Sequence, residues 1–210
     1  PSLLRYGRHY RVAEIDSAFA HDDQGGFRLA VEQCNGVGAC RKVGSGVMCP
    51  SYMATKDERD TTRGRANALR LAMSGQLGEE PHLALASSEV DEVLSLCLSC
   101  KACKQECPNS VDMSRLKADV LDMQHRQHGT PLGHRLIGHM PDYAPYAAGM
   151  MAPLVNALQS AAPSRWLMDK LTGIDRRRIP PKFAKKTLKR LLQHREAKHD
   201  GSASPTVVLF

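Results

Sequence analysis

The stretch Cys97-Leu98-Ser99-Cys100-Lys101-Ala102-Cys103-Lys104-Gln105-Glu106-Cys107-Pro108 decides how the rest of this chain is interpreted. Its cysteines are separated by two, two and three residues, and a proline follows the fourth. Bacterial ferredoxins have this pattern, in which three closely spaced thiolates wrap one cubane cluster and the fourth reaches a neighbouring cluster. We therefore expect iron-sulfur clusters, with the fold arranged around them.

A degenerate copy of the same motif lies upstream, as Cys34-x5-Cys40-x8-Cys49-Pro50. Val37 stands where the middle cysteine would be, and the copy ends in the same Cys-Pro pair. In two-cluster ferredoxins each motif lends its last cysteine to the other cluster. We therefore expect a 4Fe-4S site with four cysteine ligands drawn from both motifs: Cys97, Cys100, Cys103 and Cys49.

The second site keeps three thiolates, Cys34, Cys40 and Cys107, with the apolar Val37 at the missing corner. This is the ligand set expected of a 3Fe-4S cluster. The alternative is a 4Fe-4S cluster whose fourth iron takes water, a carboxylate or a residue from outside this chain. All seven cysteines are then predicted metal ligands: Cys34, Cys40, Cys49, Cys97, Cys100, Cys103 and Cys107.

The cysteine count also argues against other roles. An odd number of cysteines, gathered in two groups, suits metal binding in a reducing compartment better than a disulfide framework, so we expect a cytoplasmic protein. A tetrahedral zinc site needs four ligands and would leave three cysteines without a role. No phosphate loop, nucleophile motif or paired carboxylates appear, so we assign no catalytic residue and no other cofactor-binding residue.

The net charge of +7 is concentrated near the C-terminal end. Residues 175–199 carry ten Arg or Lys against two acidic residues, a net of +8, so the rest is near neutral. With no interleaved aromatic beyond Phe183 and no recognition motif, this basic stretch indicates a solvated helix face, not a nucleic-acid contact. No run approaches the roughly 18–20 apolar residues of a transmembrane helix, and the first residues lack the apolar core of a signal peptide.

Apolar residues recur at helical spacing, which predicts a mainly α fold, a helical two-cluster ferredoxin-like domain with a helical C-terminal extension. We expect the methionines and Trp166 of the extension to lie in a core. The predicted helices cover residues 26–33, 61–74, 87–97, 112–128, 151–161, 164–171 and 182–198.

We divide the chain into four parts: 1–33, an N-terminal lead-in; 34–130, the dicluster domain; 131–200, the extension with a basic amphipathic helix; and 201–210, a linker and the first strand of a following domain. The first residue is not Met, and Val207-Val208-Leu209-Phe210 has the composition of a strand. We therefore expect an excerpt of a longer polypeptide.

Several stretches together resemble a known family. They are Cys34-Asn35-Gly36-Val37-Gly38-Ala39-Cys40-Arg41, Met48-Cys49-Pro50-Ser51-Tyr52-Met53-Ala54-Thr55, Thr62-Arg63-Gly64-Arg65-Ala66-Asn67 and the run from Cys97 to Pro108. They resemble the iron-sulfur segment of the bacterial FAD and iron-sulfur D-2-hydroxyacid dehydrogenases, of the D-2-hydroxyglutarate dehydrogenase type. The pairing of the cysteines is also similar to that in the helical ferredoxin domain of succinate dehydrogenase's iron-sulfur subunit.

The resemblance implies a flavin domain upstream and a cysteine-rich domain downstream, with FAD and the hydroxyacid site outside this chain. It also implies hydride transfer from a D-2-hydroxyacid to FAD and single electrons passing through the clusters to an unidentified acceptor. One alternative is a cluster subunit of a glycolate oxidase or glycerol-3-phosphate dehydrogenase type complex. Another, of a different class, is a structural zinc or nucleic-acid-binding module.

Overall fold

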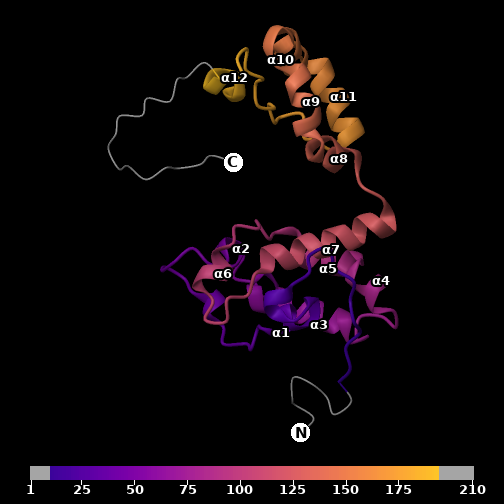
Figure 1. Ribbon diagram of the computed structural model, residues 1–210. Coiled ribbons are helices and arrows are strands. Elements are labelled where there is room, and N and C mark those ends of the chain that lie inside the picture. Colours follow the sequence, from indigo (N-terminus) through magenta and orange to yellow (C-terminus); the bar gives the residue numbers. More distant parts are fainter. Residues whose placement is uncertain (1–9, 194–210) are drawn as a thin grey trace. The chain divides into compact units, whose positions relative to one another are not determined.

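The computed structural model describes residues 10–193 (Figure 1). Within this range the chain forms helices and turns and contains no strand, which confirms the prediction of a mainly α fold. It divides into two compact units, Pro1–Gly129 and Thr130–Phe210. No helix in the described range is long and apolar enough to span a membrane.

The first unit holds all seven cysteines. Its helices are α1 (Phe27–Glu32), α2 (Pro50–Thr55), α3 (Thr62–Met73), α4 (Pro81–Leu85), α5 (Ser88–Ser95), α6 (Ala102–Glu106) and α7 (Met113–His128), with 3-10 turns at Asp22–Gln24, Ala39–Arg41 and Glu58–Asp60.

Side-chain caps explain where the longer helices begin. Thr61 accepts a hydrogen bond from the amide of Gly64 at the start of α3, and Asp112 accepts one from the amide of Arg115 at the start of α7. Such a side-chain oxygen satisfies an amide that has no partner within the helix. The helices predicted before and between the cysteine loops are therefore present, with ends within a few residues of those expected.

Helix α3 lies at the centre of the first unit and packs against α1, α4, α5 and α7. The apolar stripe of α7 faces the same core, since Leu116 and Val120 are buried. Burial of these side chains stabilises the unit by roughly 25 cal/mol per Å² of apolar surface removed from water. Its largest fully buried apolar side chains include Val31, Met48, Leu69, Met73, Leu85, Val90, Val111, Met113, Leu116 and Val120.

The segment before α1 is held to α7 by a buried pair. His21 Nε2 lies 2.6 Å from Asp119 Oδ2, and both side chains are fully buried. The amide of Phe19 donates to the other carboxylate oxygen at 3.0 Å. The lead-in is thereby anchored before the first cysteine, and α1 then delivers the chain to Cys34.

The second unit consists of short helices. They are α8 (Leu132–Gly138), α9 (Met140–Ala147), α10 (Ala152–Ser160), α11 (Ala162–Thr172) and α12 (Leu188–Gln193), with a 3-10 turn at Gly149–Met151. The prediction that its methionines and tryptophan form a core is wrong, because Trp166 is 51% exposed and Met150 98% exposed. Too few elements pack together here to cover those side chains.

The predicted helix over residues 182–198 begins later than expected. Of residues 182–193, only Leu188–Gln193 (α12) is helical, and Leu188, Leu191 and Leu192 are exposed instead of facing a core. Residues 194–198, the predicted linker and the predicted strand lie outside the described residues.

Candidate metal centres

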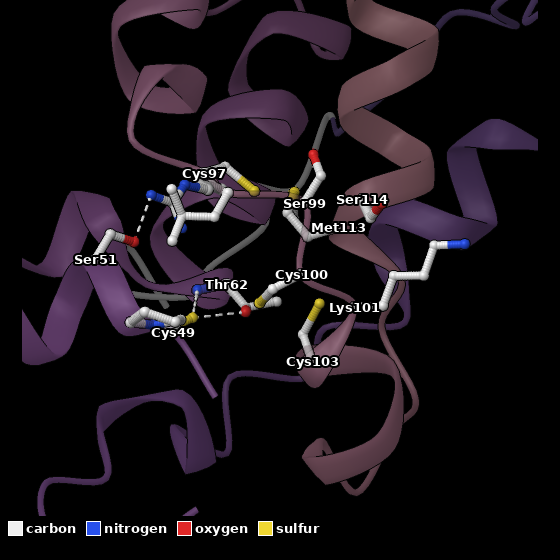
Figure 2. Close-up of a pocket in the computed structure, with 13 residues that line it drawn as sticks. Cys49, Ser51, Thr62, Cys97, Ser99, Cys100, Lys101, Cys103, Met113 and Ser114 are labelled. Carbon is white, nitrogen blue, oxygen red and sulfur yellow. Dashed lines mark hydrogen bonds between the residues drawn. The ribbon is translucent and has the colours of Figure 1, made fainter. Parts of the chain in front are cut away.

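Four cysteines line one cavity of about 320 Å³, its open mouth included. They come from three places: the loop before α2, the loop that joins α5 to α6, and the start of α6. Figure 2 shows the four around the same space. They are Cys49, Cys97, Cys100 and Cys103.

The backbone wraps this cavity in an unusual conformation. Cys49, Ser99 and Lys101 have positive φ angles of 53°, 51° and 61°. This left-handed conformation costs non-glycine residues roughly 1–2 kcal/mol each, and such residues gather at functional sites. Reversing the chain at these points turns the cysteine side chains of one loop toward a common centre.

Burial disfavours the thiolate form of two of these cysteines. It raises the pKa of the Cys103 thiol to about 11, because the charged sulfur loses its hydration. Burial also raises the pKa of the Cys49 thiol, although hydrogen bonds from Thr62 oppose that rise. A buried thiolate therefore needs a positive partner, and iron supplies one, so the donor set fits a metal cluster.

The second cavity is lined by three cysteines and Val37 and has a volume of about 240 Å³, its mouth included. Cys34 and Cys40 are buried, whereas Cys107 is partly exposed. Val37 is 60% exposed. The residue that stands where the intact motif would have a cysteine is thus an apolar side chain that lines the cavity and is partly exposed to solvent.

The two cavities divide the seven cysteines as the exchange between motifs predicts. Cys49, the last cysteine of the degenerate motif, lines the same cavity as the first three cysteines of the intact motif. Cys107, the last cysteine of the intact motif, lines the cavity that contains Cys34 and Cys40. Among the described residues, no three cysteine, histidine or carboxylate side chains gather closely enough to hold a single metal ion. The thiols instead lie along the walls of the two cavities.

Long-range hydrogen bonds fix the cysteine loops, and sequence patterns did not indicate them. The carboxylate of Glu106 accepts from the amides of Val47 (2.7 Å) and Met48 (3.2 Å), which joins the loop before Cys49 to α6. Lys117 Nζ donates to the carbonyls of Leu94 and Cys97, both at 2.8 Å. These partners are 59, 58, 23 and 20 residues apart, so no local spacing reveals them.

The other cavity is held in the same manner. Asn109 Nδ2 donates to the carbonyl of Gln33 at 2.7 Å, and Arg70 Nη2 donates to the carbonyl of Cys34 at 3.1 Å. Outer contacts of this kind orient metal ligands and tune their properties.

Comparison with known proteins gives concordant matches. Residues 30–111 match the family described as a 4Fe-4S dicluster domain. A D-2-hydroxyglutarate dehydrogenase of Pseudomonas putida is 29% identical over 176 residues, which covers 68% of this chain and 17% of that protein. The enzyme of the same name from Escherichia coli is 29% identical over 154 residues, 58% of this chain and 15% of that protein.

A probable glycolate oxidase iron-sulfur subunit of Bacillus subtilis is 31% identical over 90 residues, 42% of this chain and 19% of that protein. The chain thus spans less than a fifth of the length of these relatives. No solved structure shows a significant match. The matches confirm the resemblance drawn from the cysteine motifs.

Proposed function

We propose that the chain relays electrons within a flavin-dependent dehydrogenase, on the premise that residues 30–111 match the 4Fe-4S dicluster domain family. An iron-sulfur cluster gains and loses single electrons at a potential that its surroundings set. The chain's own part is to hold two clusters, fix their ligands and limit the access of water. The convergence of all seven cysteines on two cavities carries this proposal.

Each cavity has its own proposed ligand set. Cys49, Cys97, Cys100 and Cys103 hold a 4Fe-4S cluster. Cys34, Cys40 and Cys107 hold the second cluster, either 3Fe-4S or a 4Fe-4S cluster whose fourth iron binds a ligand that is not cysteine.

We also propose the oxidation reaction that supplies electrons to the clusters. A D-2-hydroxyacid, in the first instance D-2-hydroxyglutarate, is oxidised at FAD in a domain outside this chain, and the clusters pass the electrons to an acceptor. The similarity to D-2-hydroxyglutarate dehydrogenases supports this assignment. The described residues show no catalytic constellation, so we expect the isolated chain, loaded with clusters, to oxidise no hydroxyacid.

The test begins with the chain reconstituted with iron and sulfide under anaerobic conditions. We expect a brown protein with iron and sulfide bound in near-equal amounts. In Cys49→Ser the first cluster should be lost or altered, whereas Ser114→Ala, which changes a neighbour in the same cavity without removing a thiol, should retain both clusters. A colourless protein that binds zinc and rejects iron would refute the electron-transfer role.

A second candidate is the cluster subunit of a glycolate oxidase type complex, which the Bacillus subtilis match favours. The two candidates differ in the donor that reduces the clusters. In the complete protein or complex, D-2-hydroxyglutarate should reduce them and glycolate should not, if the first proposal holds. The opposite result would select the second candidate.

A further inference from the structure

Thr62 lies between the two cavities and contributes to the walls of both. It is the first residue of α3 and is only 2% exposed. Its amide donates to Cys49 Sγ at 3.1 Å, and its hydroxyl oxygen lies 3.0 Å from the same sulfur. Figure 2 shows both contacts converging on that sulfur.

The direction of the hydroxyl contact follows from the chemistry of the sulfur. In a free thiol either atom could be the donor. A thiolate bound to iron carries no proton, so the Thr62 hydroxyl must then donate. Cys49 would thus receive two hydrogen bonds from one residue, both directed at a charged acceptor, the stronger class of hydrogen bond.

The surroundings hold Thr62 in this position. Thr61 caps α3 through the amide of Gly64 at 2.8 Å, which fixes the first turn. Arg65 Nη2 donates to the Ser51 hydroxyl at 2.9 Å, so the start of α3 is tied to α2, the helix that follows Cys49. A β-branched side chain has few rotamers, and little freedom is therefore left to the hydroxyl.

We infer that Thr62 is a positioning residue that raises the reduction potential of the cluster ligated by Cys49. This inference rests on the proposed function. Adding one electron to a cluster increases the negative charge on its sulfurs, and donors aimed at a ligand sulfur stabilise that reduced state more than the oxidised one. Loss of the hydroxyl should leave the amide contact in place and shift the potential downward.

The test compares three forms of the full chain by redox titration monitored by EPR. Thr62→Val has nearly the same shape as the native residue but lacks the hydroxyl, whereas Thr62→Ser keeps the hydroxyl and lacks the methyl group. At a fixed ambient potential we expect the ratio of reduced to oxidised cluster to fall about threefold to tenfold in Thr62→Val. A tenfold change corresponds to a shift of about 59 mV for a one-electron couple. Thr62→Ser should stay near the native value.

The second cluster serves as an internal reference, because the hydroxyl is directed at Cys49 and should affect the other cavity less. Equal potentials in the native chain and in Thr62→Val, with both clusters present, would overturn the inference and leave the proposed function intact. An equal drop in Thr62→Ser would also overturn it. A native chain that takes up no iron and sulfide would instead overturn the proposed function.

Thr62→Val could fail to bind the first cluster, in which case Thr62→Ala is titrated in its place. A lowered potential in Thr62→Ala supports the inference, and an unchanged one overturns it. If neither variant assembles the cluster while Thr62→Ser does, Thr62 is needed for assembly and its assignment as a residue that sets the potential is wrong.

Discussion

At the scale of single residues, Val37 lines the second cavity and stands where the intact motif would place a fourth thiolate. If a 3Fe-4S cluster is bound there, the oxidised protein should show its paramagnetic EPR signal, and Val37→Cys should remove that signal by supplying a soft ligand of similar volume. Iron per chain should rise by about one.

Val43→Cys is a matched control, because this valine is 62% exposed and belongs to the same segment but does not line the cavity. It should change neither the signal nor the iron content. Two four-iron clusters in anaerobic Mössbauer spectra of the native protein would rule out the three-iron assignment and require a fourth ligand other than cysteine.

Gly64 tests how tightly α3 fits against the turn that precedes it. A Cβ atom at this position would collide with the carbonyl of Glu58 and the Cα atom of Arg59, which are main-chain atoms and shift less easily than the end of a flexible side chain. We expect Gly64→Ala to destabilise the protein by about 1–3 kcal/mol, the usual cost of overpacking.

Gly138→Ala is the control for that prediction, since an added Cβ would meet nothing there. Thermal unfolding should show a lower midpoint for Gly64→Ala and little change for Gly138→Ala. Equal midpoints for the two variants would mean that the turn can move away from α3.

At the scale of helices, Lys117 joins α7 to the end of α5 and to the first residue of the intact motif. Its ammonium group satisfies the carbonyls of Leu94 and Cys97. Lys117→Met should cost about 1.5–3 kcal/mol, because hydrogen bonds from a charged group are lost. The Leu94 carbonyl keeps its hydrogen bonds from the amides of Leu96 and Cys97, so the loss falls mainly on the Cys97 carbonyl. Chemical denaturation of the loaded protein measures the difference.

Lys104→Met is the comparison, because this lysine is half exposed and its ammonium group lies 3.5 Å from the buried carboxylate of Asp112. The ammonium group keeps much of its hydration, which weakens the ion pair, so we expect a smaller effect than that of Lys117→Met. A loss of stability as large as that of Lys117→Met would show that charge near the clusters matters more than the two carbonyl contacts.

The helices also show what sequence can and cannot predict. Capping residues such as Thr61 and Asp112 mark helix starts locally, so the helices around the cysteine loops could be placed in advance. The grouping of the cysteines could be anticipated from motif spacing. Thr62, Glu106 and Lys117 could not be identified, because their partners depend on how distant segments pack.

In the second unit, sequence patterns predicted burial that the structure does not show. Periodicity identifies an apolar helix face, but it does not say what covers that face. Trp166 and Met150 therefore look like core residues in the sequence and are exposed in the structure. Pro81 begins the short helix α4, which is not among the predicted helices, and proline is tolerated there because it lies in the first helical turn.

At the scale of the whole molecule, cluster removal should act on the first unit alone. Both cavities join loops that lie far apart in sequence, so we expect the iron-free chain to lose much of the tertiary order of Pro1–Gly129. Hydrogen exchange there should accelerate on iron chelation. The single tryptophan, Trp166, lies in the second unit and provides a separate probe. Its emission should stay unchanged, and a parallel change would show that the units unfold together.

In the proposed ligand sets, Cys49 and Cys107 each bind the cluster that is otherwise held by the other motif. This exchange has a consequence for the insertion of the clusters into the chain. Binding of either cluster brings segments of both motifs together, because each cavity contains cysteines of both motifs. Most ligands of the remaining cluster are then already in place. The second insertion then requires less ordering of the chain than the first. Loading should consequently be cooperative. With limiting iron and sulfide, native mass spectrometry should find mostly empty and doubly loaded chains, with few that carry a single cluster.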